Sequence, residues 1–187
     1  MKIFLDCSDV DLIKHGFESG LVDGVTTNPS LMLKAGKNPM DVLKEISEIF
    51  PFHSSISAEV VGDTVDSMLE EAEEYLQIGP NITIKVPCTR TGLKTCLELS
   101  KMDVAVNVTL IFSAAQAILA SKAGATYVSP FIGRLNDQYW DGISLVEEIS
   151  DVFTTHSSKT EILAASIREP IQVAKCFRVG ADICTLP

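Results

Sequence analysis

The stretch NITIKVPCTRTGLKTCLELSKMDVAVNVTL, residues 81–110, decides the fold because it reads as a strand, a helix and a second strand. Residues Asn81–Val86 and Val104–Leu110 are short runs rich in β-branched side chains, and Thr91–Leu99 has the pattern of an amphipathic helix. Two strands joined through a helix are predicted to be parallel, because parallel strands cannot be joined by a tight turn.

The same alternation runs through the whole chain of 187 residues. Helical patterns, with glycines where helices end, separate the strand-like runs. We predict further strands at Lys2–Asp6, Asp23–Thr27, Ser55–Glu59, Thr126–Pro130, Thr160–Ser166 and Ala181–Leu186, and further helices at Pro39–Ile49, Thr64–Leu76, Ser113–Ala123, Ser144–Thr154 and Ile171–Val179.

Eight such strands in so short a chain predict a single α/β domain, residues 1–187, folded as a compact (β/α)8 TIM barrel. A doubly wound open sheet is the alternative, but the chain has no glycine-rich dinucleotide-binding motif that would favour it. The printed sequence ends at Pro187, directly after the eighth strand, so we expect the barrel to lack the C-terminal helix that would follow this strand.

The charge and the cysteines of the chain narrow the choice of partners and of compartment. The formal net charge is -10 and there is no cluster of basic residues, so nucleic acid and membrane are poor candidates. Five cysteines without Cys-x-x-Cys or Cys/His spacing predict reduced thiols in a cytoplasmic protein, and no bound metal. We expect no signal peptide, and no apolar run is long enough to cross a membrane.

Polar and ionisable side chains occupy the carboxyl ends of nearly all the predicted strands. In a (β/α)8 barrel these ends meet at one rim, where the active site lies. We therefore predict a site at this rim, formed by Asp6, Thr26, Thr27, Asn28, Glu59, Lys85, Asn107, Thr109, Ser129, Phe131, Ser166 and Arg168.

Successive side chains of a strand point to opposite faces, which sorts the residues near this rim further. Ile84, Val106 and Val108 are expected to face the helices. The inner face is then small and polar, whereas a barrel built only for stability would fill this layer with Val, Ile and Leu. The pairs expected to share the inner face are Lys85 with Thr83, Asn107 with Thr109, and Ser166 with Ala164.

Lys85 ends an apolar strand, which is a costly place for an ammonium group because the charged form loses its hydration. A neutral lysine is a nucleophile that forms a Schiff base with a carbonyl substrate. The alternative is a lysine whose tip simply reaches water from the strand end.

A Schiff-base reaction also needs proton transfer, and two carboxylates are available for it. Glu59 is predicted to act as both acid and base, and Asp6 is suited to accept a hydroxyl proton during carbon–carbon cleavage. Asp6 could instead cap the first helix, although Ser8 and Asp9 could also fill that role. The side chains that could hydrogen-bond a ligand or an active-site water are Asn28, Asn107 and Thr109.

Two arginines, Arg134 and Arg168, follow the sixth and seventh strands. Guanidinium groups suit phosphate oxygens, and Ser166 could add a hydroxyl donor. Phosphate sites of (β/α)8 barrels are often built from these late loops, so we predict an anion site here. Surface salt bridges to Asp137 or Glu169 are the alternative.

Six segments with specific motifs carry a resemblance to a known family: GLVDGVTTNPSL (20–31), ISAEVV (56–61), ITIKVPCT (82–89), NVTLIFSAAQA (107–117), AGATYVSPFIGRLND (123–137) and ILAASIREP (162–170). Over essentially its whole length the chain resembles the small-subunit transaldolases and the closely related fructose 6-phosphate aldolases. The resemblance implies a (β/α)8 barrel that needs no cofactor and assembles as a homo-oligomer, a decamer or a pentamer.

The resemblance also implies roles for individual residues. Lys85 in IKVP looks like the Schiff-base lysine, and Asp6 in FLD like the catalytic aspartate. Glu59 in SAEV looks like the acid/base partner that works with Thr109 and a water molecule. Asn28 in TTNPS looks like a ligand to the donor hydroxyls. The residues that look like the phosphate site are Arg134, Ser166 and Arg168.

The two branches of this family differ at three positions that the sequence reports. Transaldolases have glutamate, asparagine and phenylalanine where the aldolases tend to have glutamine, an aliphatic residue and tyrosine. This chain has Glu59, Asn107 and Phe131, so it resembles the transaldolases at all three positions. A tyrosine hydroxyl could protonate the bound donor fragment or position water beside it and so favour its release, which phenylalanine cannot do.

The resemblance thus implies a transaldolase of the pentose phosphate pathway. It would move a dihydroxyacetone unit from sedoheptulose 7-phosphate or fructose 6-phosphate to glyceraldehyde 3-phosphate or erythrose 4-phosphate. An aldolase that releases free dihydroxyacetone is the alternative with the same chemistry. A non-catalytic barrel that binds sugar phosphates is the alternative from another class.

Overall fold

The computed structural model describes residues 1–187, with all side chains except that of Ala35. Its parallel strands form a closed barrel in chain order, and the last strand pairs with the first. This confirms the predicted (β/α)8 barrel. The strands are β1 (Lys2–Asp6), β2 (Gly24–Thr26), β3 (Ser55–Glu59), β4 (Ile82–Pro87), β5 (Val106–Ile111), β6 (Tyr127–Pro130), β7 (Glu161–Ala164) and β8 (Ile183–Leu186).

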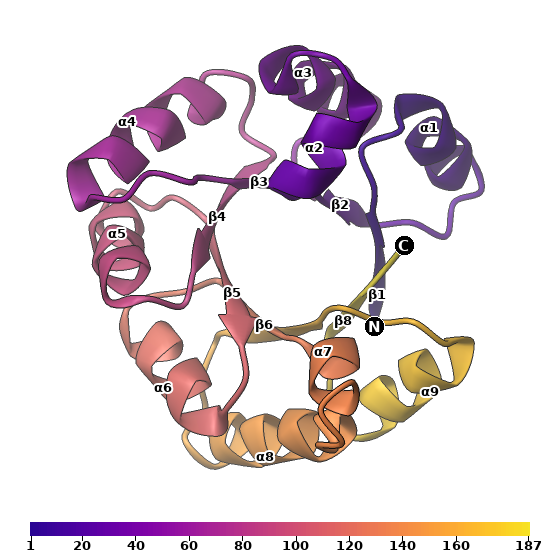
Figure 1. Ribbon diagram of the computed structural model, residues 1–187, viewed down its shortest axis with the longest axis vertical. Helices are drawn as coiled ribbons and strands as arrows, with labels where there is room; N and C mark the ends of the chain where they lie inside the picture. The colour runs from indigo at the N-terminus through magenta and orange to yellow at the C-terminus, as the bar shows by residue number, and fades with distance from the viewer.

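The helices form a ring outside the strands, as the view in Figure 1 shows. Three of them (α1, α2 and α7) lie outside the helices predicted by range. Helices α2 and α7 have only 7 and 5 residues, which give too little periodicity to read. The helices are α1 (Val10–Glu18), α2 (Pro29–Ala35), α3 (Pro39–Ile49), α4 (Val65–Leu76), α5 (Arg90–Lys101), α6 (Ala114–Lys122), α7 (Ile132–Asn136), α8 (Gly142–Thr155) and α9 (Pro170–Arg178).

Capping side chains fix where the first helices begin. Asp9 is the N-cap of α1, and its Oδ1 accepts hydrogen bonds from the backbone N–H groups of Asp11 and Leu12 at 3.0 and 3.1 Å. Asp6, which ends β1, is therefore not needed as the cap of this helix. Asn28 caps α2, because its Oδ1 accepts a hydrogen bond from the backbone N–H of Leu31 at 3.0 Å.

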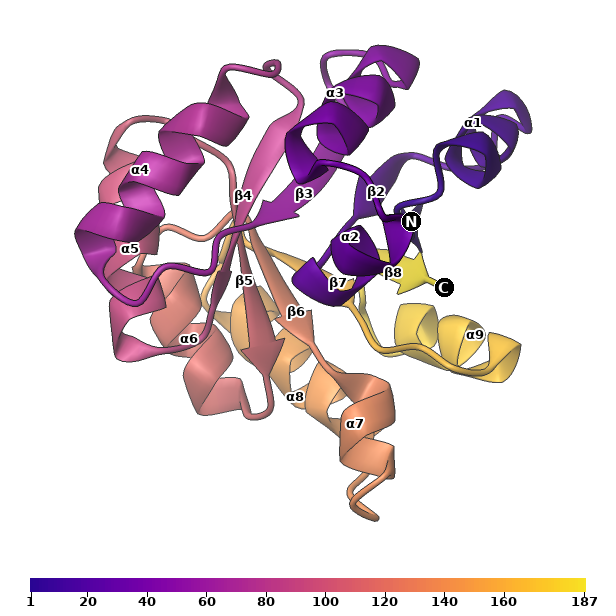
Figure 2. The same ribbon diagram turned by 45° about the horizontal axis from the view of Figure 1, so that its top comes forward.

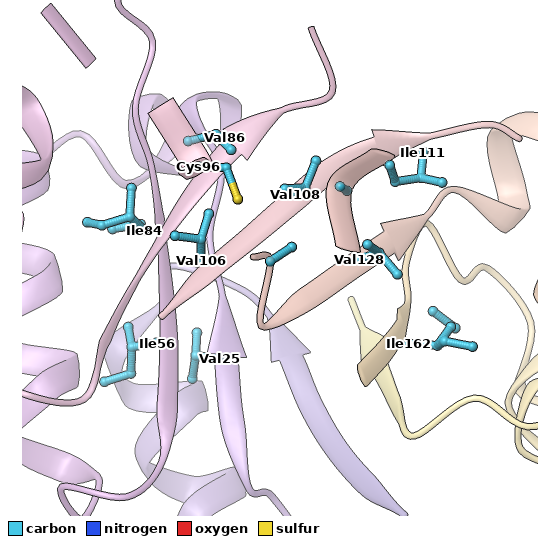
Figure 3. Packing of buried hydrophobic residues seen from close by; sticks show 14 of the residues in the cluster. Val25, Ile56, Ile84, Val86, Cys96, Val106, Val108, Ile111, Val128 and Ile162 are labelled. Carbon is cyan, nitrogen blue, oxygen red and sulfur yellow. The ribbon is translucent and has the colours of Figure 1, made fainter. Parts of the chain in front are cut away.

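The main core lies between the barrel and its ring of helices. Figure 3 shows its side chains along neighbouring strands, where Val25, Ile56, Ile84, Val106 and Val108 each have an exposed fraction of 0%. Ile84, Val106 and Val108 therefore face the helices as predicted. The large apolar residues of the strands thus meet the apolar faces of the helices, which is why the alternation of strand-like runs and amphipathic helices identifies the fold from the sequence.

The interior of the barrel is apolar on one side and polar on the other. Phe4, Leu163, Ala165 and Ile183 form a small buried cluster inside it. Across the barrel the interior carries hydroxyl and amide groups, such as the pair Ser55 and Thr83, whose oxygens lie 2.8 Å apart. The cavity above this layer is lined mainly by polar and ionisable side chains, together with a few apolar ones such as Leu163 and Ala165.

Strand β8 closes the barrel by pairing with β1 in parallel, with Leu186 opposite Leu5, so Met1 lies at the amino end of these two strands and Pro187 at their carboxyl end (Figure 1 and Figure 2). In the described residues β8 ends at Leu186 and no helix follows it. None of the described helices is both long enough and apolar enough to cross a membrane.

Candidate active site

A cavity of about 460 Å³ lies at the carboxyl ends of the strands. Every side chain that the sequence predicts for the site lines this cavity except that of Thr27, whose hydroxyl donates a hydrogen bond to the carbonyl oxygen of Ser57. Several residues that the sequence did not suggest also line it. The predicted residues that line it are Asp6, Thr26, Asn28, Glu59, Lys85, Asn107, Thr109, Ser129, Phe131, Arg134, Ser166 and Arg168; the others include Leu110, Leu163, Ala165 and Thr185.

Lys85 is held by two oxygen atoms inside the cavity. Its Nζ lies 3.0 Å from Oε2 of Glu59 and donates a hydrogen bond of 2.9 Å to the carbonyl oxygen of Thr27. The Lys85 side chain has an exposed fraction of only 7%, so its tip does not reach bulk water. The lysine is thus a buried amine in contact with a carboxylate that can accept its proton.

Glu59 and Lys85 are neighbours because of the strand register. Their Cα atoms are partners in the pairing of β3 with β4, and both side chains point into the barrel. Glu59 is 15% exposed, which leaves its carboxylate accessible from the cavity. A carboxylate at 3.0 Å from the amine is within the distance required of a general base.

Asp6 is hydrogen-bonded to Thr26, which in turn contacts Thr185. Thr26 Oγ1 donates a hydrogen bond of 2.8 Å to Oδ1 of Asp6, and it lies 2.7 Å from Oγ1 of Thr185. Thr185 lies on β8, where its polar side chain ends an apolar strand just as the predicted site residues do. A search for polar residues near the ends of the strands could have found Thr185, but the sequence alone does not indicate its contact with Thr26.

Asn107 lies at the centre of a second hydrogen-bonded group. Its Oδ1 accepts a hydrogen bond of 2.7 Å from Ser129 Oγ, and its Nδ2 donates one of 3.2 Å to Ser57 Oγ. All three side chains are buried. Ser57 lies one layer below the rim, so a search of strand ends does not identify it. The group fixes the amide of Asn107 against the wall of the cavity.

Thr109 carries a buried hydroxyl without a partner. Its Oγ1 lines the cavity and makes no hydrogen bond to any of the described residues. A buried hydroxyl that makes no hydrogen bond lowers the stability of the folded state, so such groups are uncommon and call for an explanation. The next residue, Leu110, has a left-handed backbone with φ of 60°, and the register of β5 against β6 shifts there. The Thr109 hydroxyl is therefore a candidate to hold a ligand or a water.

The two arginines differ in their surroundings. Arg168 donates two hydrogen bonds, of 2.8 and 2.6 Å, to the carboxylate of Asp137, so the salt bridge considered from the sequence exists. Arg168 nevertheless lines the cavity. Arg134 lies over the ring of Phe131, with 5.2 Å from its guanidinium carbon to the ring centroid, and among the described residues no carboxylate is within ion-pair distance of it. Arg134 is thus the cation better able to meet an anionic ligand.

The prediction that Ser166 shares a face with Ala164 is wrong. Strand β7 ends at Ala164, which packs outward, whereas Ala165 and Ser166 line the cavity. Ser166 reaches the cavity because its backbone is left-handed, with φ of 58°, and this breaks the alternation of the strand. The backbone N–H of Gly133 donates a hydrogen bond of 2.9 Å to the carbonyl oxygen of Ser166 and holds the two loops together.

The cysteines are not part of this cavity in the described residues. Burial raises the pKa of the Cys96 thiol to about 12 and also raises the pKa of Cys88. Such thiols are poor nucleophiles and poor metal ligands at neutral pH. Within the part of the chain that the structure describes, His, Cys, Asp and Glu side chains form no cluster suited to a metal ion.

Comparison with known proteins gives a consistent result over the whole chain. The family model described as Transaldolase/Fructose-6-phosphate aldolase matches residues 3–187. A protein of Cereibacter sphaeroides named "Probable transaldolase" is 51% identical over 187 residues, which is 100% of this chain and 84% of the relative. Proteins with the same name from Geotalea daltonii and Clostridium kluyveri are 52% and 51% identical over 100% of this chain and 86% of their own lengths.

Proposed function

Because the chain belongs to the transaldolase/fructose-6-phosphate aldolase family, we propose that it transfers a dihydroxyacetone unit between sugar phosphates through a Schiff base on Lys85. The observation that carries this proposal is the buried contact of 3.0 Å between Nζ of Lys85 and Oε2 of Glu59, in a cavity that also holds Asp6. These groups supply an amine nucleophile, a proton acceptor beside it and a second carboxylate.

The first step forms the covalent bond. Glu59 takes a proton from the Lys85 ammonium, and the neutral amine attacks the C2 carbonyl of the ketose phosphate. The carbinolamine then loses its hydroxyl group as water, with Glu59 returning the proton, and an iminium ion remains. The unpaired hydroxyl of Thr109 supports a role in holding the water that carries these protons.

The second step breaks the bond between C3 and C4. Asp6 accepts the proton of the C4 hydroxyl, the electrons of the bond move into the iminium ion, and an enamine of dihydroxyacetone stays on Lys85. Fructose 6-phosphate would release glyceraldehyde 3-phosphate, and sedoheptulose 7-phosphate would release erythrose 4-phosphate. Addition of the enamine to the other aldose phosphate, followed by hydrolysis, completes the transfer. The chemistry needs no cofactor.

The donor and its phosphate would be held by the remaining lining residues. Thr26, Asn28, Asn107 and Ser129 supply hydroxyl and amide groups for the sugar hydroxyls. Arg134, Ser166 and Arg168 would bind the phosphate at the loops after β6 and β7, where (β/α)8 barrels often place such a site. The salt bridge with Asp137 neutralises part of the positive charge of Arg168, so Arg134 would supply most of the electrostatic attraction for the phosphate.

Phe131 favours transfer over simple release. Its ring packs edge to face against Phe112, with 5.9 Å between the centroids, and its other neighbour is the Arg134 guanidinium. The Phe131 side chain itself has no hydroxyl that could deliver a proton to the enamine. The bound fragment would then wait for an aldose acceptor, which is the behaviour of a transaldolase rather than an aldolase.

The release of glyceraldehyde 3-phosphate from fructose 6-phosphate, with and without erythrose 4-phosphate, tests the proposal. A transaldolase releases it at a sustained rate only when the acceptor is present, and Phe131→Tyr should raise the release without acceptor. Sustained release from the unmodified protein without acceptor would favour an aldolase instead. Absence of release under both conditions would favour a barrel that only binds sugar phosphates.

We also propose, on the family resemblance alone, a homo-oligomer that acts in the cytoplasm on the pentose phosphate pathway. Size-exclusion chromatography with light scattering would measure the number of subunits directly.

A further inference from the structure

A short chain of hydrogen bonds inside the barrel ends on the carboxylate of Asp6. Thr185 Oγ1 on β8 lies 2.7 Å from Thr26 Oγ1 on β2, which in turn donates a bond of 2.8 Å to Oδ1 of Asp6 on β1. The two threonines come from the strands on either side of β1, because β1 pairs with both β2 and β8. All three side chains line the cavity.

The direction of the hydrogen bonds in this chain follows from counting protons. A threonine hydroxyl has one proton to donate, and Thr26 gives its proton to Oδ1 of the ionised Asp6. The contact of 2.7 Å with Thr185 then requires the Thr185 hydroxyl to donate to the oxygen of Thr26. Thr26 and Thr185 are 2% and 3% exposed, so bulk water has little access to replace either bond.

We propose that Thr185 is a positioning residue for the cleavage of the carbon–carbon bond. Its hydroxyl keeps Thr26 turned toward Oδ1 of Asp6, which leaves Oδ2 to accept the proton of the substrate hydroxyl. Hydrogen bonds in series also polarise one another, so donation from Thr185 strengthens the bond from Thr26 to the carboxylate. This inference rests on the proposed function, since it assigns Asp6 to the cleavage step.

The two chemical steps depend on Thr185 differently. Formation of the Schiff base uses Lys85 and Glu59, which lie on β4 and β3 and do not contact Thr185. Cleavage uses Asp6, which Thr185 orients through Thr26. Loss of the Thr185 hydroxyl is therefore expected to slow cleavage and to leave formation of the Schiff base intact, a difference that a general structural defect would not produce.

The test compares Thr185→Val, which keeps the shape of the side chain and removes the hydroxyl, with Thr185→Ser, which keeps the hydroxyl. Thr83→Val is the matched control, because Thr83 also forms a buried hydroxyl pair across two strands, with Ser55 at 2.8 Å, but does not line the cavity. Each protein is incubated with dihydroxyacetone and borohydride to trap the Schiff base, and kcat and KM are measured with fructose 6-phosphate and erythrose 4-phosphate.

Thr185→Val should lower kcat by about three- to tenfold, the effect of one hydrogen bond, with KM within about twofold of the unmodified protein. Its yield of trapped adduct should equal that of the unmodified protein. Thr185→Ser should recover kcat to within about twofold, and Thr83→Val should change neither quantity. Should Thr185→Val fail to fold, Thr185→Ala is expected to show the same pattern.

An unchanged kcat in Thr185→Val would overturn the inference. Equal losses of trapping and of cleavage would also overturn it, since they would indicate a structural role. A failure of the unmodified protein to form any adduct is a separate outcome, which overturns the proposed function and with it this inference.

Discussion

Nζ of Lys85 lies 3.0 Å from Oε2 of Glu59, and the two residues are direct partners in the pairing of β3 with β4. The register of the barrel thus places the proposed nucleophile and its proposed proton acceptor in contact before any substrate arrives. Such preorganisation reduces the entropy that the reaction has to lose on the way to the transition state. Both groups are largely buried, so neither can be removed without leaving the other charge uncompensated.

Glu59→Gln keeps the size of the side chain but removes the proton acceptor next to Lys85. We expect kcat with fructose 6-phosphate and erythrose 4-phosphate to fall by about 10²- to 10⁴-fold, the usual contribution of a general acid–base group. Loss of the counter-charge should also lower the free energy of unfolding, measured by urea denaturation, by about 3–5 kcal/mol. Glu59→Asp, which keeps the charge, should lose less stability. A Gln variant with full activity would show that Glu59 moves no proton.

Thr109→Val replaces a buried hydroxyl that has no partner among the described residues with a methyl group of similar size. Because no hydrogen bond within the protein is lost, the free energy of unfolding should change by less than about 1 kcal/mol. If this hydroxyl holds the water that carries protons to and from Glu59, kcat should fall by about tenfold or more. Urea denaturation and steady-state kinetics measure the two quantities. Unchanged kcat would exclude the role.

Arg134→Ala removes the guanidinium that has no carboxylate partner in the described residues. Hydrogen bonds to a charged group are worth about 1.5–3 kcal/mol, so KM for fructose 6-phosphate should rise by about tenfold or more. KM for unphosphorylated dihydroxyacetone as donor should stay nearly constant. Arg134→Lys, which keeps the charge without the fork of donors, should give an intermediate value. An equal rise in KM for both donors would show that Arg134 does not bind the phosphate.

Gly133→Ala tests the contact between the loops after β6 and β7. A Cβ atom at this position would lie 2.1 Å from the carbonyl oxygen of Ser166 and 2.8 Å from Nε of Arg168. The backbone carbonyl has to move, so the variant should lose about 1–3 kcal/mol of stability and bind phosphorylated substrates more weakly.

Gly79→Ala is a suitable control for this variant. A Cβ atom there would approach only side-chain atoms, of Ser47 and Asn81, and the position is far along the chain from the two loops. Its KM values should match those of the unmodified protein. A Gly133→Ala variant that behaves like this control would mean that the fit between the loops does not shape the anion site.

The barrel could be predicted from the sequence because short β-rich runs alternate with helical patterns along the whole chain, with large apolar residues on the strand face that meets the helices, as at Ile84, Val106 and Val108. The carboxyl ends of parallel strands share one rim, so the polar residues there could be grouped without knowledge of any distance. For this reason the sequence alone assigns Asp6, Glu59 and Lys85 to one site, although they are far apart along the chain.

The remaining features depend on contacts that no local pattern encodes. The left-handed backbone of Ser166, which packs against Gly133, breaks the alternation on which the prediction of its face rests. The contact of Thr185 with Thr26 depends on closure of the barrel through β8 and β1. The salt bridge between Arg168 and Asp137 joins two loops, and the sequence could only offer it as an alternative.

The central claim is that Lys85 carries the substrate covalently, and borohydride trapping tests it most directly. The protein is incubated with fructose 6-phosphate and borohydride, digested, and its peptides are identified by mass spectrometry. We predict a reduced three-carbon adduct on Lys85, and no adduct in Lys85→Arg, since arginine stays protonated and cannot form the imine. An adduct on another residue, or one that persists in Lys85→Arg at the yield of the unmodified protein, would contradict the account.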